Sequence, residues 1–225
     1  MYYRTFFLFI LISSTLKAQS NDTIKSTKYL EDQIYVGFSV INLTNMPNGI
    51  TQNGLSNSFE LGVIKDIPVN DKGDFAFGIG LGYGRNTYFQ NLKIEEVNNT
   101  TQFQIAAEGF KNNKFSMHTI DIPLEIRWRT STIDKYKFWR IYAGGKLSYV
   151  FASNAKIKEL GNTSKVKGIS EMNELQFGLK LAVGYGTWNF NFYYGLTDLF
   201  SDANLNETTP IEIRDFRIGL IFYIL

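Results

Sequence analysis

The chain has 225 residues, of which 44% are hydrophobic and 16% aromatic, with a formal charge of +2, no cysteine and a single histidine. The lack of cysteine excludes disulfides, thiol nucleophiles, cysteine-based metal sites and a cysteine-linked lipid anchor, and one histidine leaves little for zinc binding or histidine catalysis. A nearly neutral chain has no general attraction to nucleic acid. We therefore expect no bound metal, no cofactor and no nucleic-acid partner.

The first 18 residues have the features of a secretory signal peptide. Arg4 supplies the positive start, and residues 5–12 (TFFLFILI) form an apolar core that is too short to span a bilayer as a helix. Cleavage after Ala18 would remove Arg4 and Lys17, which lowers the formal charge from +2 to 0. We expect a leader at 1–18, a short periplasmic segment at 19–32 and a single barrel domain at 33–225.

Beyond the leader, apolar residues alternate with small or polar ones, and this period of two predicts eight β-strands. The expected strands are 33–43, 58–66, 74–86, 117–129, 138–152, 174–186, 188–199 and 212–225. The connections after the first, third, fifth and seventh strands are longer than those after the second, fourth and sixth. This pattern is typical of an up-and-down antiparallel barrel with one elaborated rim, and the even strand count places both termini at the trimmed rim.

The third predicted strand indicates which face of the sheet meets lipid. Its odd positions from Phe75 to Tyr83 are large and apolar, whereas its even positions are Ala76 and glycines. Eight such strands would direct roughly 40 large side chains into one lumen, although an eight-stranded barrel has little interior room. The apolar face must therefore point outward, which predicts an all-β, eight-stranded transmembrane barrel in the outer membrane rather than a soluble lipocalin-like barrel. Aromatic residues near the strand ends would form the interfacial girdles: Tyr83, Trp128, Trp139, Tyr149, Tyr185 and Trp188.

The same parity directs charged side chains into the lumen. Five acids and five bases are expected there: Glu60, Asp121, Glu125, Glu174, Asp215, Arg127, Arg140, Lys146, Lys180 and Arg217. These residues could form a selective ion path or proton relay. We favour a structural, cross-braced plug, because small barrels are usually filled and unpaired charges in a narrow lumen are costly.

Two motifs invite an enzymatic interpretation. In GIGLGYG, the glycines from Gly78 to Gly84 keep a strict spacing of two, which continues a strand and does not open the helix that a nucleotide-binding loop requires. His118 lies two residues after Ser116, and some outer-membrane lipases place a serine and a histidine on the barrel surface. A histidine at the membrane interface without a catalytic role is the favoured interpretation, so we expect no catalytic residues.

The longest connection, residues 87–116, retains partial alternation over 102–106 and predicts a β extension beyond the membrane. Phe103, Phe110 and Phe115 lie in this connection. Exposed, these rings would provide a contact surface for a partner protein. Alternatively, they pack against neighbouring loops, and the sequence does not separate these two arrangements.

The segments HTIDIPLEIRWR (118–129), FYYGLTDLF (192–200) and FRIGLIFYIL (216–225) resemble those of the PorT-like outer-membrane β-barrel proteins of Bacteroidetes, as does a leader ending in Ala-Gln. The resemblance covers about residues 29–225. One departure is the C-terminus, Tyr223-Ile224-Leu225, where many outer-membrane barrels end in Phe.

The founding member of the PorT-like family is required for type IX secretion, and no catalytic or ligand residues are established for the family. The resemblance implies a non-enzymatic scaffold or accessory protein in secretion or envelope assembly. Its partners would be outer-membrane lipid and secretion or envelope proteins that contact its long surface loops. A small channel or an adhesin-like surface barrel is the alternative, followed by a membrane-embedded lipid hydrolase.

Overall fold

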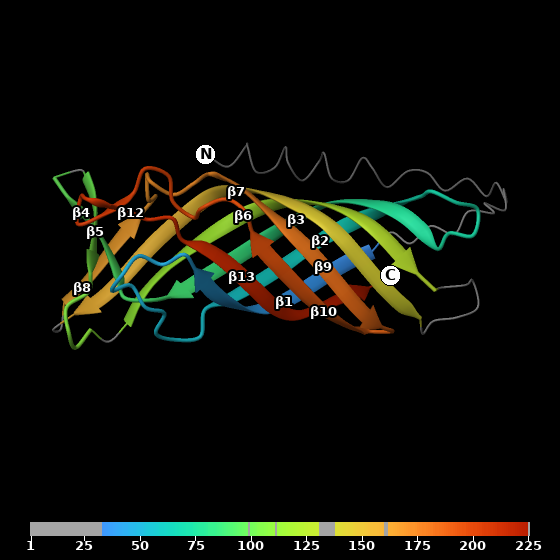
Figure 1. Cartoon of the computed structure of the whole chain (residues 1–225), viewed down its shortest axis with the longest axis horizontal. Coiled ribbons are helices and arrows are strands. Elements are labelled where there is room, and N and C mark those ends of the chain that lie inside the picture. The colour runs from blue at the N-terminus through green and yellow to red at the C-terminus, as the bar shows by residue number, and fades with distance from the viewer. Residues whose placement is uncertain (1–32, 99, 111, 131–137, 160–161, 225) are drawn as a thin grey trace, which may run out of the picture.

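A computed structural model of the chain describes residues 33–98, 100–110, 112–130, 138–159 and 162–224. The expected leader at 1–18 and periplasmic segment at 19–32 lie outside the described residues. Eight strands wind around one axis in an antiparallel barrel (Figure 1). These are β1 (Gln33–Thr44), β2 (Asn57–Pro68), β3 (Phe75–Phe89), β6 (Asn112–Arg129), β7 (Trp139–Glu159), β9 (Leu175–Tyr185), β10 (Trp188–Gly195) and β13 (Arg214–Ile224).

The strand order confirms the predicted up-and-down topology. Each barrel strand pairs with the barrel strand that precedes it in the sequence, through antiparallel ladders. The first and last strands pair with each other from Ile34↔Ile224 to Thr44↔Arg214, which closes the barrel so that each of its eight strands pairs on both sides. Within the described part of the chain, no helix has the length and hydropathy needed to cross a membrane.

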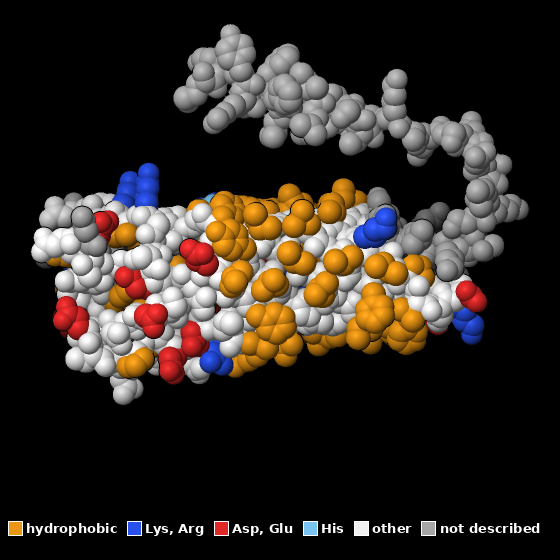
Figure 2. Space-filling view, turned by 90° about the horizontal axis from the view of Figure 1, so that it is seen from above, with side chains coloured by type: hydrophobic (Ala, Val, Ile, Leu, Met, Phe, Trp, Pro, Cys, Tyr) orange, Lys and Arg blue, Asp and Glu red, His pale blue; other side chains and the backbone are white. Residues whose placement is uncertain are grey.

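The barrel wall is apolar outside and polar inside, as the parity argument predicts. Outward residues such as Phe77 and Leu81 are 54% and 57% exposed, whereas the inward glutamates Glu60 and Glu125 are buried. Hydrophobic side chains cover the wall of the barrel in Figure 2 and give way at one end to a polar surface. An apolar exterior of this kind is stable only when lipid covers it.

At the elaborated rim the sheet continues past the apolar wall into a second region, which we call the dome. It comprises residues 45–56, 87–98, 100–110, 112–117, 152–159, 162–174 and 196–213, including the distal ends of β6 and β7. Its additional strands are β4 (Leu92–Val97), β5 (Thr100–Ile105), β8 (Asn162–Lys167), β11 (Asn204–Leu205) and β12 (Thr209–Pro210). Figure 1 shows these strands gathered at one end of the molecule, opposite the end that holds the last residues of β13.

The dome has a hydrophobic core of the kind found in soluble proteins. Phe115 is fully buried, stacks on Tyr88 with ring centroids 4.6 Å apart and meets the edge of Phe200 at 5.3 Å. Phe103 contacts Phe200 at 5.5 Å from the other side. The same core includes Ile41 and Leu43 from β1 and Ile213 beside β13. The dome therefore closes over the barrel mouth and buries its apolar residues inward.

This core decides the alternative that the sequence left open for residues 87–116. Phe103 and Phe115 are buried and Phe110 is partly buried, so these rings pack against neighbouring loops and do not form an exposed contact surface. The physical reason is that β4 and β5 fold back over the barrel mouth, where Leu92, Ile94 and Phe103 find apolar neighbours.

Strand boundaries differ from the prediction where the dome begins. β6 starts at Asn112 instead of residue 117, and β7 runs to Glu159 instead of residue 152. The seventh predicted strand was expected to reach residue 199, but β10 ends at Gly195, and the following residues turn inward until Leu199 is buried in the dome core. All three differences lie where the chain leaves the membrane and packs against other parts of the dome.

A β-bulge marks the change from barrel wall to dome. The β6–β7 register shifts between His118 and Thr119, which pair with Ala152 and Val150 and leave Phe151 unmatched. A bulge inserts one residue and reverses which side chains face inward. Below it, Tyr149 points outward; above it, Ala155 is buried in the dome core. Apolar residues thus occupy odd positions of β7 on both sides of the bulge, such as Tyr149 and Ala155, although their surroundings change from lipid to protein.

Candidate functional site

The polar interior of the barrel is the candidate site, and it begins near the trimmed rim with two arginines that share one carboxylate. Arg127 and Arg129 both donate to Asp66, and Arg127 also donates to the side-chain oxygen of Gln33. The Arg127 guanidinium lies 3.9 Å from the centre of the Tyr142 ring. Because Asp66 comes from β2 and the arginines from β6, these contacts cross the lumen above the intervening β3.

Two lysines neutralise the middle of the lumen. Lys180 on β9 lies 3.1 Å from Glu125 on β6, and Lys146 on β7 donates to Glu60 on β2. Asp121 lies 3.4 Å from the Lys146 ammonium group. All five side chains are nearly fully buried, so each cation meets a carboxylate where water is scarce.

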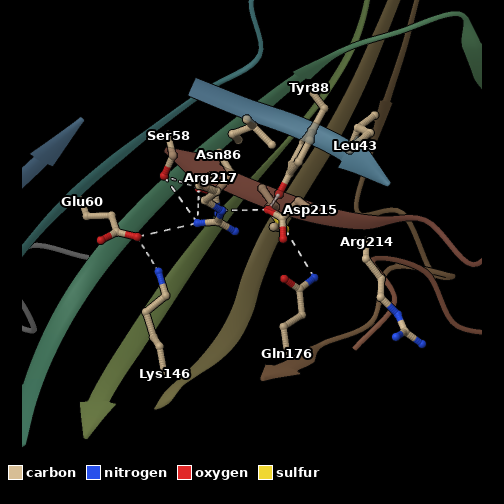
Figure 3. A network of polar contacts seen from close by, with 12 residues as sticks. Leu43, Ser58, Glu60, Asn86, Tyr88, Lys146, Gln176, Arg214, Asp215 and Arg217 are labelled. Carbon is tan, nitrogen blue, oxygen red and sulfur yellow. Dashed lines mark hydrogen bonds and ion pairs between the residues drawn. The ribbon is translucent and has the colours of Figure 1, made fainter. Parts of the chain in front are cut away.

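A third layer of lumen charges, after the Asp66 and lysine layers, lies directly beneath the dome and is built around Arg217 (Figure 3). Its guanidinium group pairs with Asp215 at 2.7 Å and donates to the side-chain oxygen of Asn86 at 2.8 Å. The Tyr88 hydroxyl donates to Asp215 at 2.9 Å, and the Tyr88 ring belongs to the dome core. Tyr88 therefore connects the charged lumen with the apolar region above it.

Tyrosine rings fill the space between the charged layers, and glycines on neighbouring strands make room for them. A side-chain carbon at Gly178 would lie 2.3 Å from the Tyr193 ring, and one at Gly82 would lie 2.1 Å from the Tyr35 hydroxyl oxygen. The ring of Tyr193 lies 4.6 Å from the Lys146 ammonium and 4.4 Å from the Arg217 guanidinium. The glycine stripes thus allow aromatic rings to lie across the lumen beside the cations.

Nine of the ten predicted lumen residues have buried side chains inside the barrel, and Glu174 does not. Glu174 is exposed because it precedes β9, in the chain that descends from the dome, so its parity does not set its direction. Arg140 lies at the trimmed rim, where it donates to the Gly186 carbonyl and covers the Phe138 ring at 4.2 Å.

Asp66 and Arg129 are buried lumen charges that were not among the ten predicted residues. Their parity could have indicated them, because Asp66 shares its parity with Glu60 on β2 and Arg129 shares its parity with Arg127 on β6. Gln33, at the start of β1, has a buried side chain that no charge pattern could have indicated.

His118 and Ser116 do not form a hydrolytic pair. The His118 Nδ1 atom lies 2.6 Å from the Tyr83 hydroxyl oxygen, whereas the Ser116 hydroxyl donates to the Asn154 side-chain oxygen at 3.0 Å. A serine nucleophile requires a base within hydrogen-bond reach, and here each residue is engaged elsewhere. Among the described residues, no group of three or more His, Cys, Asp or Glu side chains could hold a metal ion.

One ion pair joins β4 of the dome to the distal end of β7. Lys93 on β4 lies 3.0 Å from Glu159 at the end of β7 and 3.0 Å from Glu95. The hydrogen bond to Glu159 raises the pKa of Lys93, and the same bond lowers the pKa of Glu159. Both groups stay charged across the physiological range, so this pair helps to hold β4 against β7.

The barrel is closed and antiparallel, with an apolar exterior, a filled polar lumen and the dome over one end. These features define an integral outer-membrane β-barrel protein. The sequence model of the family described as "Outer membrane protein beta-barrel domain" matches residues 17–201, which is most of the chain. The chain therefore belongs to this family and to the outer membrane.

Solved structures that are similar to the chain include two crystal structures of Ail, the attachment invasion locus protein of Yersinia pestis. The first is 12% identical, with a TM-score of 0.40, and covers 86% of this chain and 97% of Ail. The second, in complex with the heparin analogue sucrose octasulfate, is 12% identical, with a TM-score of 0.39, and covers 87% and 99%. A comparison with curated protein sequences gave no match.

Proposed function

We propose that the chain is a non-enzymatic scaffold or accessory protein of the outer membrane that serves protein secretion or envelope assembly through its dome. The observation that carries this proposal is the dome core, in which Phe115 and Phe200 hold loops from four connections together beneath a polar surface. Ordered loops present a fixed surface at little cost in conformational entropy on binding. The resemblance to PorT-like proteins supports secretion as the process.

The lumen supports a structural role for the barrel. Ion pairs join different strands across it at three levels, Arg127–Asp66, Lys180–Glu125 and Arg217–Glu60, and the dome core lies over its elaborated end. A water column would have to break several of these buried pairs, each of which is costly to disrupt. We infer that the barrel anchors the dome and does not conduct ions.

An adhesin-like surface protein is the second candidate. The tip of the β4–β5 hairpin favours it, because Val97 is 41% exposed there between polar neighbours. A tip of this kind would contact a surface outside the cell, whereas a secretion or envelope partner would contact the dome at the outer membrane of the same cell.

The test uses a strain that lacks the gene and expresses surface variants of the dome. Glu96→Ser with Val97→Ser changes the hairpin tip, and Glu174→Ser with Glu212→Ser changes an exposed acidic flank. These variants leave the core residues in place, unlike deletion of the whole connection, which would remove Leu92, Ile94 and Phe103. We expect at least one pair to reproduce the secretion or envelope defect of the null strain.

The matched control is Asp71→Ser with Lys72→Ser in the turn between β2 and β3, which lies at the trimmed rim. It should restore the wild-type phenotype, and all variants should assemble equally, as measured by heat-modifiable migration on gels. Full complementation by every dome variant would overturn the proposal. Loss of cell attachment with normal secretion would select the adhesin-like alternative.

A further inference from the structure

A row of lysines crosses the outer surface of three adjacent strands at the base of the dome. Lys114 on β6 is paired directly with Lys156 on β7, and Lys156 is paired directly with Lys165 on β8. Their neighbours Phe115, Ala155 and Val166 are buried in the dome core, so alternation turns all three lysines outward. Like charges directly opposite one another destabilise a sheet, so this arrangement has a cost in the free protein.

Other cations extend the row, and no acid offsets it. Lys167 is paired with Asn154 one step nearer the membrane, and exposed Arg85 on β3 is paired with His118. In the described parts of β3, β6, β7 and β8, the acidic residues are Asp121 and Glu125 in the lumen and Glu159, which is bound to Lys93. None of the four lysines of the row and its extension lies within ion-pair distance of a carboxylate among the described residues. The Lys114 ammonium group lies over the Phe89 ring at 5.3 Å.

These lysines line a groove of about 590 Å³, a volume suited to a small ligand. Its lower wall is formed by His118, Phe151 and Ala152 at the β-bulge. Phe151 is 50% exposed and continues the apolar surface of the barrel wall. One end of the groove is thus apolar and the other carries ammonium groups, in the order in which a lipid presents its acyl chains and its headgroup.

We propose that this groove binds the phosphate groups of a phosphorylated glycolipid in the outer leaflet of the outer membrane. The groove lies on the elaborated side of the apolar wall, away from the termini, which is the outward side in outer-membrane barrels. Ammonium groups bind phosphate as point charges, and a phosphate among them removes the repulsion within the row. The bulge is what brings Lys156 to the outer surface, because it reverses the facing of β7 above Phe151.

The opposite flank of the dome argues against a general attraction to anions. Asp202, Glu207 and Glu212 are exposed in the connection before β13, and Figure 2 shows Asp and Glu side chains over much of the dome in that view. The charge is therefore divided between two flanks, and an anionic headgroup would be held only beside β6, β7 and β8.

Binding is tested with full-length protein refolded in a zwitterionic detergent and titrated with lipid A that carries two phosphates. The probes for comparison are lipid A without phosphates and inorganic phosphate alone. We expect tight, salt-sensitive binding only to the phosphorylated lipid. The variant Lys156→Gln with Lys165→Gln should bind about 30-fold more weakly, since each lysine near an anionic lipid contributes roughly fivefold.

The control variant is Lys65→Gln with Lys72→Gln, which removes two exposed lysines near the trimmed rim and should keep the affinity within about twofold. A second variant, Lys156→Glu, places a carboxylate between Lys114 and Lys165. It should raise resistance to heat unfolding in detergent and abolish lipid binding, a combination that a structural role for Lys156 would not produce.

Equal affinity for lipid A with and without phosphates would overturn the proposal. So would unchanged binding by the Lys156→Gln, Lys165→Gln variant, or full competition by inorganic phosphate at the concentration of the lipid, which would indicate a site for the free anion only.

Discussion

Removing the carboxylate of Glu125 should destabilise the barrel strongly, because it leaves the charge on Lys180 without its partner. Among the described residues, Glu125 is the carboxylate within ion-pair distance of the Lys180 ammonium group, at 3.1 Å, and both side chains are nearly fully buried. Breaking a buried pair from one side costs about 3–5 kcal/mol. Arg127 loses less, since it keeps Asp66. We expect Glu125→Ala to lower the free energy of unfolding by that amount.

The assay is urea unfolding in detergent, followed by tryptophan fluorescence, with heat-modifiable migration on gels as a second measure. Replacing both partners, as in Glu125→Leu with Lys180→Met, should recover most of the loss, because an apolar pair leaves no isolated charge in the lumen. Glu96→Ala, on the exposed surface of β4, is the control and should change stability by less than about 0.5 kcal/mol. Two results would refute the interpretation of the lumen charges as a structural plug. One is a double variant whose loss of unfolding free energy equals the sum of the single losses, and the other is a loss below about 1 kcal/mol in Glu125→Ala.

Other predictions concern the lumen, the interface and the dome. The refolded protein should show no steady, large conductance in planar bilayers; reproducible channels whose ion selectivity changes with Lys146→Glu would contradict this. Gly178→Val should displace the ring of Tyr193 and lower heat resistance on gels, because the new side chain would overlap it; unchanged heat resistance would show that the ring has room. His118→Ala should leave stability and any lipid-modifying activity unchanged, and a large loss of activity would revive the hydrolase hypothesis. Phe200→Ala should cost the dome about 3–5 kcal/mol and expose it to limited proteolysis while the barrel stays resistant; equal sensitivity of both regions would mean that they unfold together.

The barrel could be predicted from the sequence because one physical rule governs its whole wall. Strict alternation assigns the residues of β3 from Phe75 to Tyr83 to lipid or lumen, and the limited volume of an eight-stranded barrel decides which is which. The same rule identified Glu60, Lys146 and Arg217 as lumen residues. The rule also assigns Asp66 to the lumen, because its parity matches that of Glu60, although Asp66 is not among the ten predicted residues.

The dome could not be predicted in the same way, because alternation describes two faces without saying what covers them. Along β7, Tyr149 and Ile157 are both apolar and odd-numbered, yet the first faces lipid and the second faces the dome core. One unmatched residue, Phe151, makes this difference, and nothing in its identity indicates a bulge. The error for Glu174 has the same origin, since parity holds only inside a continuous strand.

The dome core draws on both sides of the junction where the sheet closes. Ile41 and Leu43 come from β1, Ile211 and Ile213 come from the chain that leads into β13, and the amide of Leu199 donates to the Ile213 carbonyl at 2.8 Å. The junction of the first and last strands is the one place where an up-and-down barrel can separate without breaking a hairpin. Because the dome core takes residues from both sides of this junction, it can form completely only after β1 and β13 have paired, and it then holds the two strands together. We therefore expect the dome to complete its folding after the barrel has closed, and to oppose sideways opening of the barrel at this junction.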